Sequence, residues 1–310
     1  MNHRHRNSLA LDTIFDGIVD KSYRRQAPPL LYHYTNWGAA EGILCGQHFW
    51  ETAHDCTDDE VELEAAHAVI VKAAKRLQKK YRGTAHRALY YFLNKYEQLK
   101  ISKMKTVYMT CFSQARDDIG QWEEYGDMGR GLCLGLRVLN EPVPAPHDTG
   151  SALVKVNYSE ESWGNTVTQC FEEICENLSR GDCTPTNIQL GTSALNRIAA
   201  FCSMTAKQPK WSHEQEFRHI TIFRDGVDAK PKECVCQGKT KRYLDDVDLR
   251  QDGKQLAFGV IIIGPNQDAE QAQKQVHALL EKAHYVPGSP EYPEIVVSSQ
   301  TLNFAKIAAH

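Results

Sequence analysis

Two carboxylates, Glu214 and Glu216, stand two residues apart at the head of a β-type run that ends at Phe223. Side chains at i and i+2 of a strand point to one face, so we expect both glutamates and Arg218 in one row. Carboxylates placed in this way can serve as acids, bases or electrostatic stabilisers of positive charge. A strand with a charged head and an apolar tail usually has its head in a cleft. The alternative for this segment alone is a solvated strand end.

Two further polar strand ends are candidates to share a site with the glutamates. They are Y-H-Y-T at residues 32–35 and T-C-F-S at residues 110–113. Because the three segments lie far apart in sequence, a shared site requires the fold to bring them together. The chain has no phosphate-binding G-x-x-x-x-G-K-[ST], no G-x-G-x-x-G, no G-x-S-x-G and no H-E-x-x-H motif. A nucleophilic Cys111 stays open, although nothing nearby in sequence supplies its base.

The elements that must position these residues follow an α+β pattern. Periodicity and turn residues predict the helices and strands. We expect strands at 30–35, 49–50, 106–113, 131–138, 154–158 and 216–223, and helices at 38–46, 117–124, 166–178 and 193–206. Residues 225–241 read as a polar loop. The C-terminal part, from residue 258, reads as strand, helix and strand, an order that favours a parallel pair joined by a crossover.

The domain organisation predicted is an N-terminal helical arm, residues 1–29, followed by one α+β domain, residues 30–310. A basic helical hairpin is inserted at about residues 57–105. Between residues 72 and 105 it carries eleven Lys and Arg residues and one acid, Glu97. A basic helix face is most often solvated, but it can instead dock an acidic partner or a nucleic-acid backbone.

Composition places the chain among ordinary globular proteins. Its 310 residues are 42% hydrophobic and carry a net charge of −3. We expect no membrane span, because no apolar run reaches about 18 residues, and a cytoplasmic location, because the N-terminus lacks a signal-like apolar core.

The ten cysteines are scattered. Cys234 and Cys236 form the only close pair, without a second pair at metal-ligand spacing, so we expect ordinary thiols and no metal.

A family resemblance adds to this reading. The order Y-H-Y-T, I-L-C-G, C-F-S and W-x-x-E-x-E-x-R, over about residues 30–265, resembles a bacterial family labelled a domain of unknown function. That family occurs in prophage, abortive-infection and other defence contexts. Its layout is in turn similar to that of ADP-ribosyltransferases. The resemblance implies an ADP-ribosyltransferase-like split mixed sheet with flanking helices and a helical insertion, and it implies NAD as co-substrate.

The resemblance also implies roles for individual residues. His33 would hold a ribose hydroxyl of NAD, and Ser113 would line the nicotinamide pocket. Glu216 would stabilise the oxocarbenium-like centre formed when the nicotinamide–ribose bond breaks, while Glu214 would position or deprotonate the acceptor. The remaining cofactor-binding candidates are Tyr34, Thr35, Trp122, Tyr125 and Arg218. This sequence departs from the pattern at C-F-S, where the enzymes carry S-T-S.

Each assignment has a structural alternative. His33 can be a core histidine, Ser113 can cap a helix, and Arg218 can pair with Glu216. Trp122 and Tyr125 can belong to the core.

Three functions follow from these alternatives. The first is an ADP-ribosyltransferase-like toxin or defence effector, or an NAD glycohydrolase, whose macromolecular acceptor is protein or nucleic acid. The second is a non-catalytic binding or sensor module of the same fold. The third is a Mg²⁺ nuclease that uses the acids at 117–118 and 123–124, although acids at a helix start are usually caps.

Overall fold

A computed structural model describes residues 28–302 apart from 57–59, 97–106, 139–148, 224–229, 237, 248 and 250–254. The described strands form one mixed sheet of ten strands, in which β9 and β10 are parallel and the other pairs are antiparallel. The strands are β1 (Leu30–Thr35), β2 (Phe49–Ala53), β3 (Val107–Ser113), β4 (Leu132–Arg137), β5 (Thr149–Lys155), β6 (Glu216–Phe223), β7 (Lys232–Cys236), β8 (Lys239–Val247), β9 (Phe258–Ile263) and β10 (Glu294–Val297). The predicted α+β class and mixed sheet are therefore confirmed.

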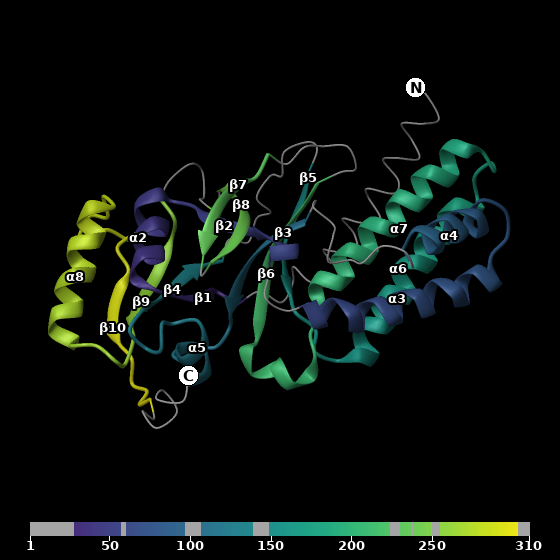
Figure 1. Ribbon diagram of the computed structural model, residues 1–310. Helices are drawn as coiled ribbons and strands as arrows, with labels where there is room; N and C mark the ends of the chain where they lie inside the picture. The colour runs from purple at the N-terminus through teal and green to yellow at the C-terminus, as the bar shows by residue number, and fades with distance from the viewer. Residues whose placement is uncertain are drawn as a thin grey trace.

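The helices flank this sheet on both faces (Figure 1). They are α2 (Trp37–Gly46), α3 (Glu60–Lys80), α4 (Gly83–Tyr96), α5 (Ile119–Glu124), α6 (Glu160–Ser179), α7 (Pro185–Thr205) and α8 (Ala269–Lys282), with short 3-10 helices η2 (His54–Cys56) and η4 (Pro209–Glu214). Polar caps fix several helix starts. Asn36, Asp118 and Thr184 each accept a backbone N–H of the first turn.

Strand β3 is the branch point of the sheet. One edge pairs with β6 along its whole length, from Val107 to Ser113. The other edge is divided, because β1 pairs only at Ser113 whereas β2 pairs only at Met109 and Tyr108. Residues 110–112 therefore face a gap in the sheet between β1 and β2.

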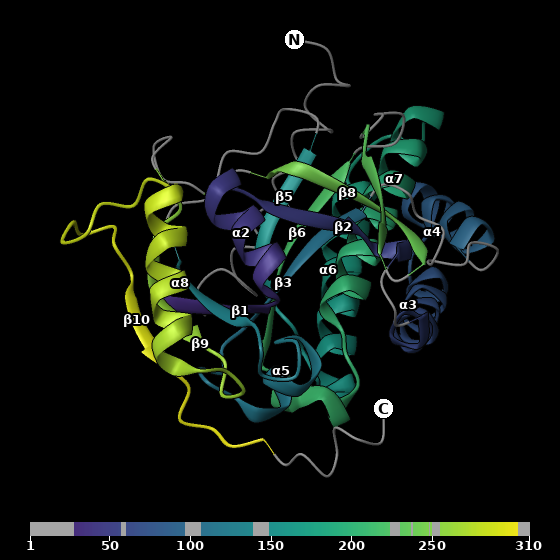
Figure 2. The ribbon, with the colours of Figure 1, turned by 60° about the vertical axis from the view of Figure 1, so that its left-hand side comes forward.

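Apolar side chains cover the two faces differently. Helices α2 and α8 lie side by side over β1, β4 and β9, as Figure 2 shows, and share one core with these strands. On the opposite face, Trp122 of α5 packs on Tyr32 and Tyr34. Helices α3, α4, α6 and α7 form a bundle against β3, β5 and β6. The predicted basic hairpin, α3–α4, is thus packed into the molecule along one side.

Close backbone approach explains the glycine-rich turn after α5. A Cβ on Gly131 would lie 2.0 Å from the carbonyl oxygen of Thr35. Only glycine lets the turn reach the end of β1 at this distance.

Several predicted elements hold, and others are corrected. Strands β1 and β6 have the predicted bounds, and the crossover to a parallel β9–β10 pair is confirmed. Within the polar loop predicted at 225–241, residues 232–236 form β7 and pair with residues 239–243 of β8 as a hairpin. Val235, Thr240 and Tyr243 are residue types that favour strands. The strand expected at 154–158 lies earlier, at Thr149–Lys155. The N-terminal arm falls outside the described residues, apart from 28–29.

Candidate functional site

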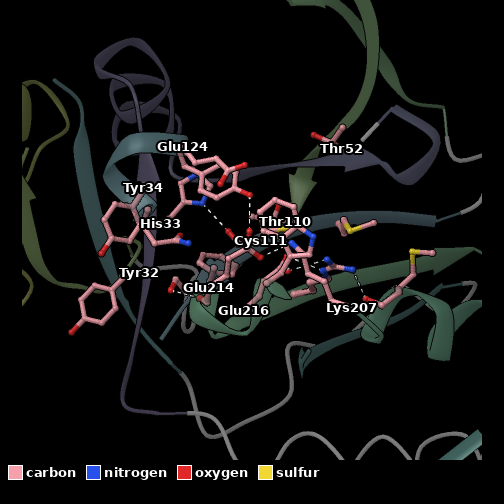
Figure 3. Close-up of a pocket in the computed structure, with 18 of the residues that line it drawn as sticks. Tyr32, His33, Tyr34, Thr52, Thr110, Cys111, Glu124, Lys207, Glu214 and Glu216 are labelled. Atoms are coloured by element: carbon pink, nitrogen blue, oxygen red, sulfur yellow. Dashed lines mark hydrogen bonds and ion pairs between the residues drawn. The ribbon is translucent and has the colours of Figure 1, made fainter. Parts of the chain in front are cut away.

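A cleft of about 690 Å³ opens at the gap in the sheet. Its floor is β3 and β6, and its walls come from β1, β2, α5 and the segment from the end of α7 to η4 (Figure 3). Seven of the nine predicted site residues line it, namely His33, Tyr34, Ser113, Tyr125, Glu214, Glu216 and Arg218. The three strand ends singled out in the sequence therefore meet in one place.

Glu216 lies at the centre of a charged cluster on the cleft floor. Its two oxygens accept hydrogen bonds from Nε and Nη2 of Arg218, at 2.8 and 2.9 Å, and Lys207 Nζ lies 3.3 Å from Oε2. Burial by itself would raise the pKa of the Glu216 carboxyl. The charges of Arg218 and Lys207 and the hydrogen bonds from Arg218 and Cys111 outweigh burial and lower this pKa to about 2. Glu216 is therefore ionised throughout the neutral range.

Arg218 is engaged by the protein itself. Besides its two bonds to Glu216, its Nη1 donates to the Met204 carbonyl at the end of α7, at 2.7 Å. The row formed by Glu216 and Arg218 on β6 is as expected. The guanidinium pairs with the carboxylate, which is the structural alternative to binding a phosphate.

Glu214 joins the same cluster, but from the 3-10 helix η4 and not from the strand that carries Glu216. It ends η4 and is followed by Gln215 in the left-handed conformation, at φ 47°, so it does not share a strand with Glu216. The expectation of two glutamates on one strand is wrong because this turn precedes β6. Lys207 nevertheless lies 2.5 Å from Glu214 Oε2, and the Tyr125 hydroxyl donates to Oε1 at 3.1 Å. One lysine thus bridges the two glutamates.

His33 stands where β1 and β3 part. Its Nδ1 lies 2.9 Å from the Cys111 carbonyl oxygen, which only accepts, so Nδ1 carries the proton. Phe49 and Phe112 flank the ring. Burial lowers the pKa of His33, against a smaller opposing effect of the Cys111 carbonyl. The neutral imidazole therefore offers Nε2 as a hydrogen-bond acceptor.

Ser113 holds the turn that carries Glu214. Its hydroxyl donates to the Glu214 carbonyl at 2.6 Å and accepts from Ala115 N at 3.0 Å. Both bonds are to backbone, so Ser113 positions the cleft wall. Cys111 is among the residues that line the cleft. Burial, with the Glu216 charge as a second cause, raises the pKa of its thiol.

The predicted aromatic residues divide into two groups. Tyr125 is 45% exposed at the cleft, and so can contact a ligand. Tyr34 reaches the cleft, but its hydroxyl donates to Ala115 O and accepts from Asp118 N, which holds the loop before α5.

Trp122 and Thr35 do not line the cleft. The Trp122 ring is wholly buried against Tyr34, and its Nε1 donates to Asp117 at 2.8 Å. Stacking of Trp122 on a ligand is therefore corrected to a core role. Thr35 is also buried, beside the tight turn at Gly131.

Two of the four acids proposed as magnesium ligands, Asp117 and Asp118, have structural partners. Asp117 accepts hydrogen bonds from the indole of Trp122 and from the hydroxyl of Ser298. It also accepts hydrogen bonds from the hydroxyl and the backbone N–H of Ser299. Asp118 caps α5. Within the part of the chain that the structure describes, no three His, Cys, Asp or Glu side chains are grouped to hold a metal ion.

Several cleft residues were missed by the sequence interpretation. Lys207 is the most important, because it neutralises two glutamates from a position just after α7. In the sequence, Lys207 is only a lysine between a helix end and Pro209, and that pattern is too common to predict a functional residue. Trp50, Trp211 and Lys241 also line the cleft. Trp211 was quoted only as the start of the glutamate segment, and Lys241 was assigned to a loop.

The comparisons with known proteins found a match to one family model over part of the chain. Residues 121–219 match the model of a family described as a protein of unknown function (DUF2971). This domain runs from α5 into β6 and so includes Tyr125, Glu214, Glu216 and Arg218, whereas His33 precedes it. No curated protein and no solved structure matches the chain. Among the described helices, none combines the length and apolar character needed to cross a membrane.

Proposed function

We propose that this protein is a cytoplasmic ADP-ribosyltransferase-like enzyme. It cleaves the nicotinamide–ribose bond of NAD in the cleft and transfers ADP-ribose to a macromolecular acceptor, protein or nucleic acid. The observation that carries the proposal is the meeting of His33, Ser113 and Glu216 in one cleft of about 690 Å³, at a split in the sheet. The free cysteines among the described residues suit a reducing compartment.

The charge state of Glu216 suits bond cleavage. Its pKa of about 2 keeps the carboxylate negative at neutral pH, where it can stabilise the positive centre that forms on the ribose. Because nicotinamide leaves as a neutral molecule, no general acid is required. Glu214, which Tyr125 orients by a hydrogen bond at 3.1 Å, is placed to accept a proton from the acceptor nucleophile.

The tautomer of His33 suits its proposed role, which is to bind a ribose hydroxyl of NAD. Since Nδ1 donates to the Cys111 carbonyl, Nε2 can accept a hydrogen bond from a ribose hydroxyl. Tyr125 supplies an exposed ring edge or face for nicotinamide. Ser113 contributes by holding the Glu214 turn.

The direct test is nicotinamide release. Purified protein is incubated with NAD, with and without cell lysate, and nicotinamide is quantified by liquid chromatography while adenylate-labelled NAD reports transfer. We expect release by the native protein and at least a hundred-fold lower rate for Glu216→Ala. Release without label transfer would assign an NAD glycohydrolase. Equal release by native protein and variant would overturn the role of Glu216.

A non-catalytic binding module is the second candidate, and one observation favours it. Both cleft glutamates are already neutralised, by Lys207 and Arg218. A site held in this state can bind a ligand without turning it over. NAD that raises the melting temperature without nicotinamide release would select this candidate.

We also propose that the activity makes the protein a toxin or defence effector. Consumption of NAD or modification of an essential acceptor would arrest the producing cell. Induced expression of the native protein should stop bacterial growth, whereas Glu216→Ala at equal abundance should not. Unimpaired growth with the native protein would contradict this role.

A further inference from the structure

We propose that the mouth of the cleft is a binding surface for single-stranded nucleic acid, with Trp50 as its base-stacking platform. This inference deepens the proposed function by naming the acceptor. It does not use the basic α3–α4 hairpin. It is carried by two walls of the mouth, each of which combines an indole ring with lysines.

The first wall lies on β2 and β8. Trp50 is 52% exposed and stacks on Tyr243, with ring centroids 4.1 Å apart and an interplanar angle of 20°. A large exposed indole held flat by a second ring is a preformed stacking surface. Thr52 pairs with Tyr243 across the strands, so this surface is continuous with the cleft, where Figure 3 shows Thr52 at the side opposite Tyr34.

Lysines follow the same face of β8. The side chains of residues 239, 241 and 243 point to the same side of the strand, because side chains two residues apart share a face. Lys241 lines the cleft itself, and Lys239 is exposed beyond it. A strand of phosphates could thus run along the lysines while a base stacks on Trp50.

The second wall is formed by Trp211 of η4. Lys207 Nζ and Lys210 Nζ lie 5.6 and 5.0 Å from the centre of its ring. The Trp211 Nε1–H is buried and makes no hydrogen bond to any described residue. The two ammonium groups beside this ring give the wall the positive charge that a phosphate would require.

The chemistry favours nucleic acid over a protein acceptor. Each wall offers an aromatic ring with lysines beside it, which is the combination that stacked bases and phosphates require. Every base has a face that stacks, so such a surface accepts single strands with little sequence preference. The proposed acceptor group would then lie near Glu214, between the two walls.

Binding is measured without NAD, so that its outcome is independent of NAD cleavage. Fluorescein-labelled 12-nucleotide RNA and DNA single strands, and a DNA duplex, are titrated with the full chain and followed by anisotropy. We expect one or both single strands to bind more tightly than the duplex. Trp50→Ala should weaken binding about ten-fold, or roughly 1.4 kcal/mol. Lys241→Gln should reduce the slope of log K against log salt by about 0.7.

The matched control removes exposed aromatic rings from the competing basic surface. Tyr90 and Tyr91 of α4 are 50% and 54% exposed, beside the cations of the hairpin. Tyr90→Ala/Tyr91→Ala should leave affinity within about two-fold. Trp50→Phe, which keeps a stacking ring, should retain most of the binding. Absence of binding to any single strand, or loss of binding only in the α4 variant, would overturn the proposal.

Discussion

Strand β6 takes part in two buried groups of polar side chains, one on each face, and a ligand has different access to them. On one face, Glu216 and Arg218 pair at 2.8 Å and join Lys207 and Glu214 at the floor of the cleft. On the other, His219 Nδ1 lies 2.5 Å from Oε1 of Glu51, which is wholly buried on β2. The side chains of both groups are paired and largely buried.

The comparison shows that burial and pairing do not by themselves mark a functional site. The cleft group contains two carboxylates and two cations, with Tyr125 as a further donor, and a ligand can reach it. The Glu51–His219 pair ties β2 to β6 and lines no part of the cleft. We therefore expect changes on the cleft face to alter turnover as well as stability, and changes on the closed face to alter stability alone.

A large effect on stability is expected at the closed pair. His219→Leu leaves the Glu51 carboxylate buried without a partner, which should lower the free energy of unfolding by about 3 kcal/mol. The double variant Glu51→Leu/His219→Leu removes both partners of the hydrogen bond and should recover most of that loss. Urea unfolding measures both. A double variant no more stable than the single one would show that the pair itself contributes the stability.

Acid should destabilise the cleft face in a defined window. The folded-state pKa of Glu216, about 2, lies below its ordinary value of 4.5. Its contribution, roughly 3 kcal/mol, is therefore fully present above about pH 4.5 and is lost as pH falls toward 2. The stability difference between native protein and Glu216→Gln, measured by urea unfolding at each pH, should shrink across this window. A difference that is constant with pH would contradict the ion pair.

Lys207 is expected to couple the two glutamates. Lys207→Met removes one of the causes that lower the pKa of Glu216 and leaves Glu214 without its cation. Stability should fall by about 2 kcal/mol at pH 7, and the acid limb of the nicotinamide-release profile should move to higher pH. Lys210→Met, at the neighbouring lysine on Trp211, is the matched control and should leave that limb in place.

The smallest effect is expected for Tyr125→Phe. The variant keeps the exposed ring but loses one hydrogen bond to Glu214, which is worth about 1 kcal/mol. Transfer to an acceptor should slow by several-fold, while nicotinamide release should change less. Equal slowing of both would place Tyr125 in bond cleavage and not in orienting Glu214.

Sequence patterns were sufficient for the strands that carry the site. The β-type runs ending at Thr35 and Ser113 and starting at Glu216 identify the three strand ends that meet. Periodicity could not place Glu214, because a left-handed residue at Gln215 is a local backbone choice with no apolar signature. It also could not find Lys207, whose role depends on where α7 ends relative to β6.

Burial was the other quantity that local patterns did not reveal. Trp122 and Tyr125 stand three residues apart, yet one is wholly buried under Tyr34 and the other is exposed at the cleft. Glu51 begins an acidic segment of the sequence, yet its side chain is wholly buried on β2. These outcomes depend on the partner strand across the sheet, which a single segment does not specify.

The most direct test separates binding from cleavage in one preparation. The Glu216→Gln variant keeps the shape of the side chain but removes its charge, so we expect it to bind NAD with a stoichiometry of one by calorimetry and to release no nicotinamide. The native protein should release nicotinamide, and His33→Phe should weaken NAD binding in the same assay. Failure of both native protein and Glu216→Gln to bind NAD would contradict the assignment of the cleft.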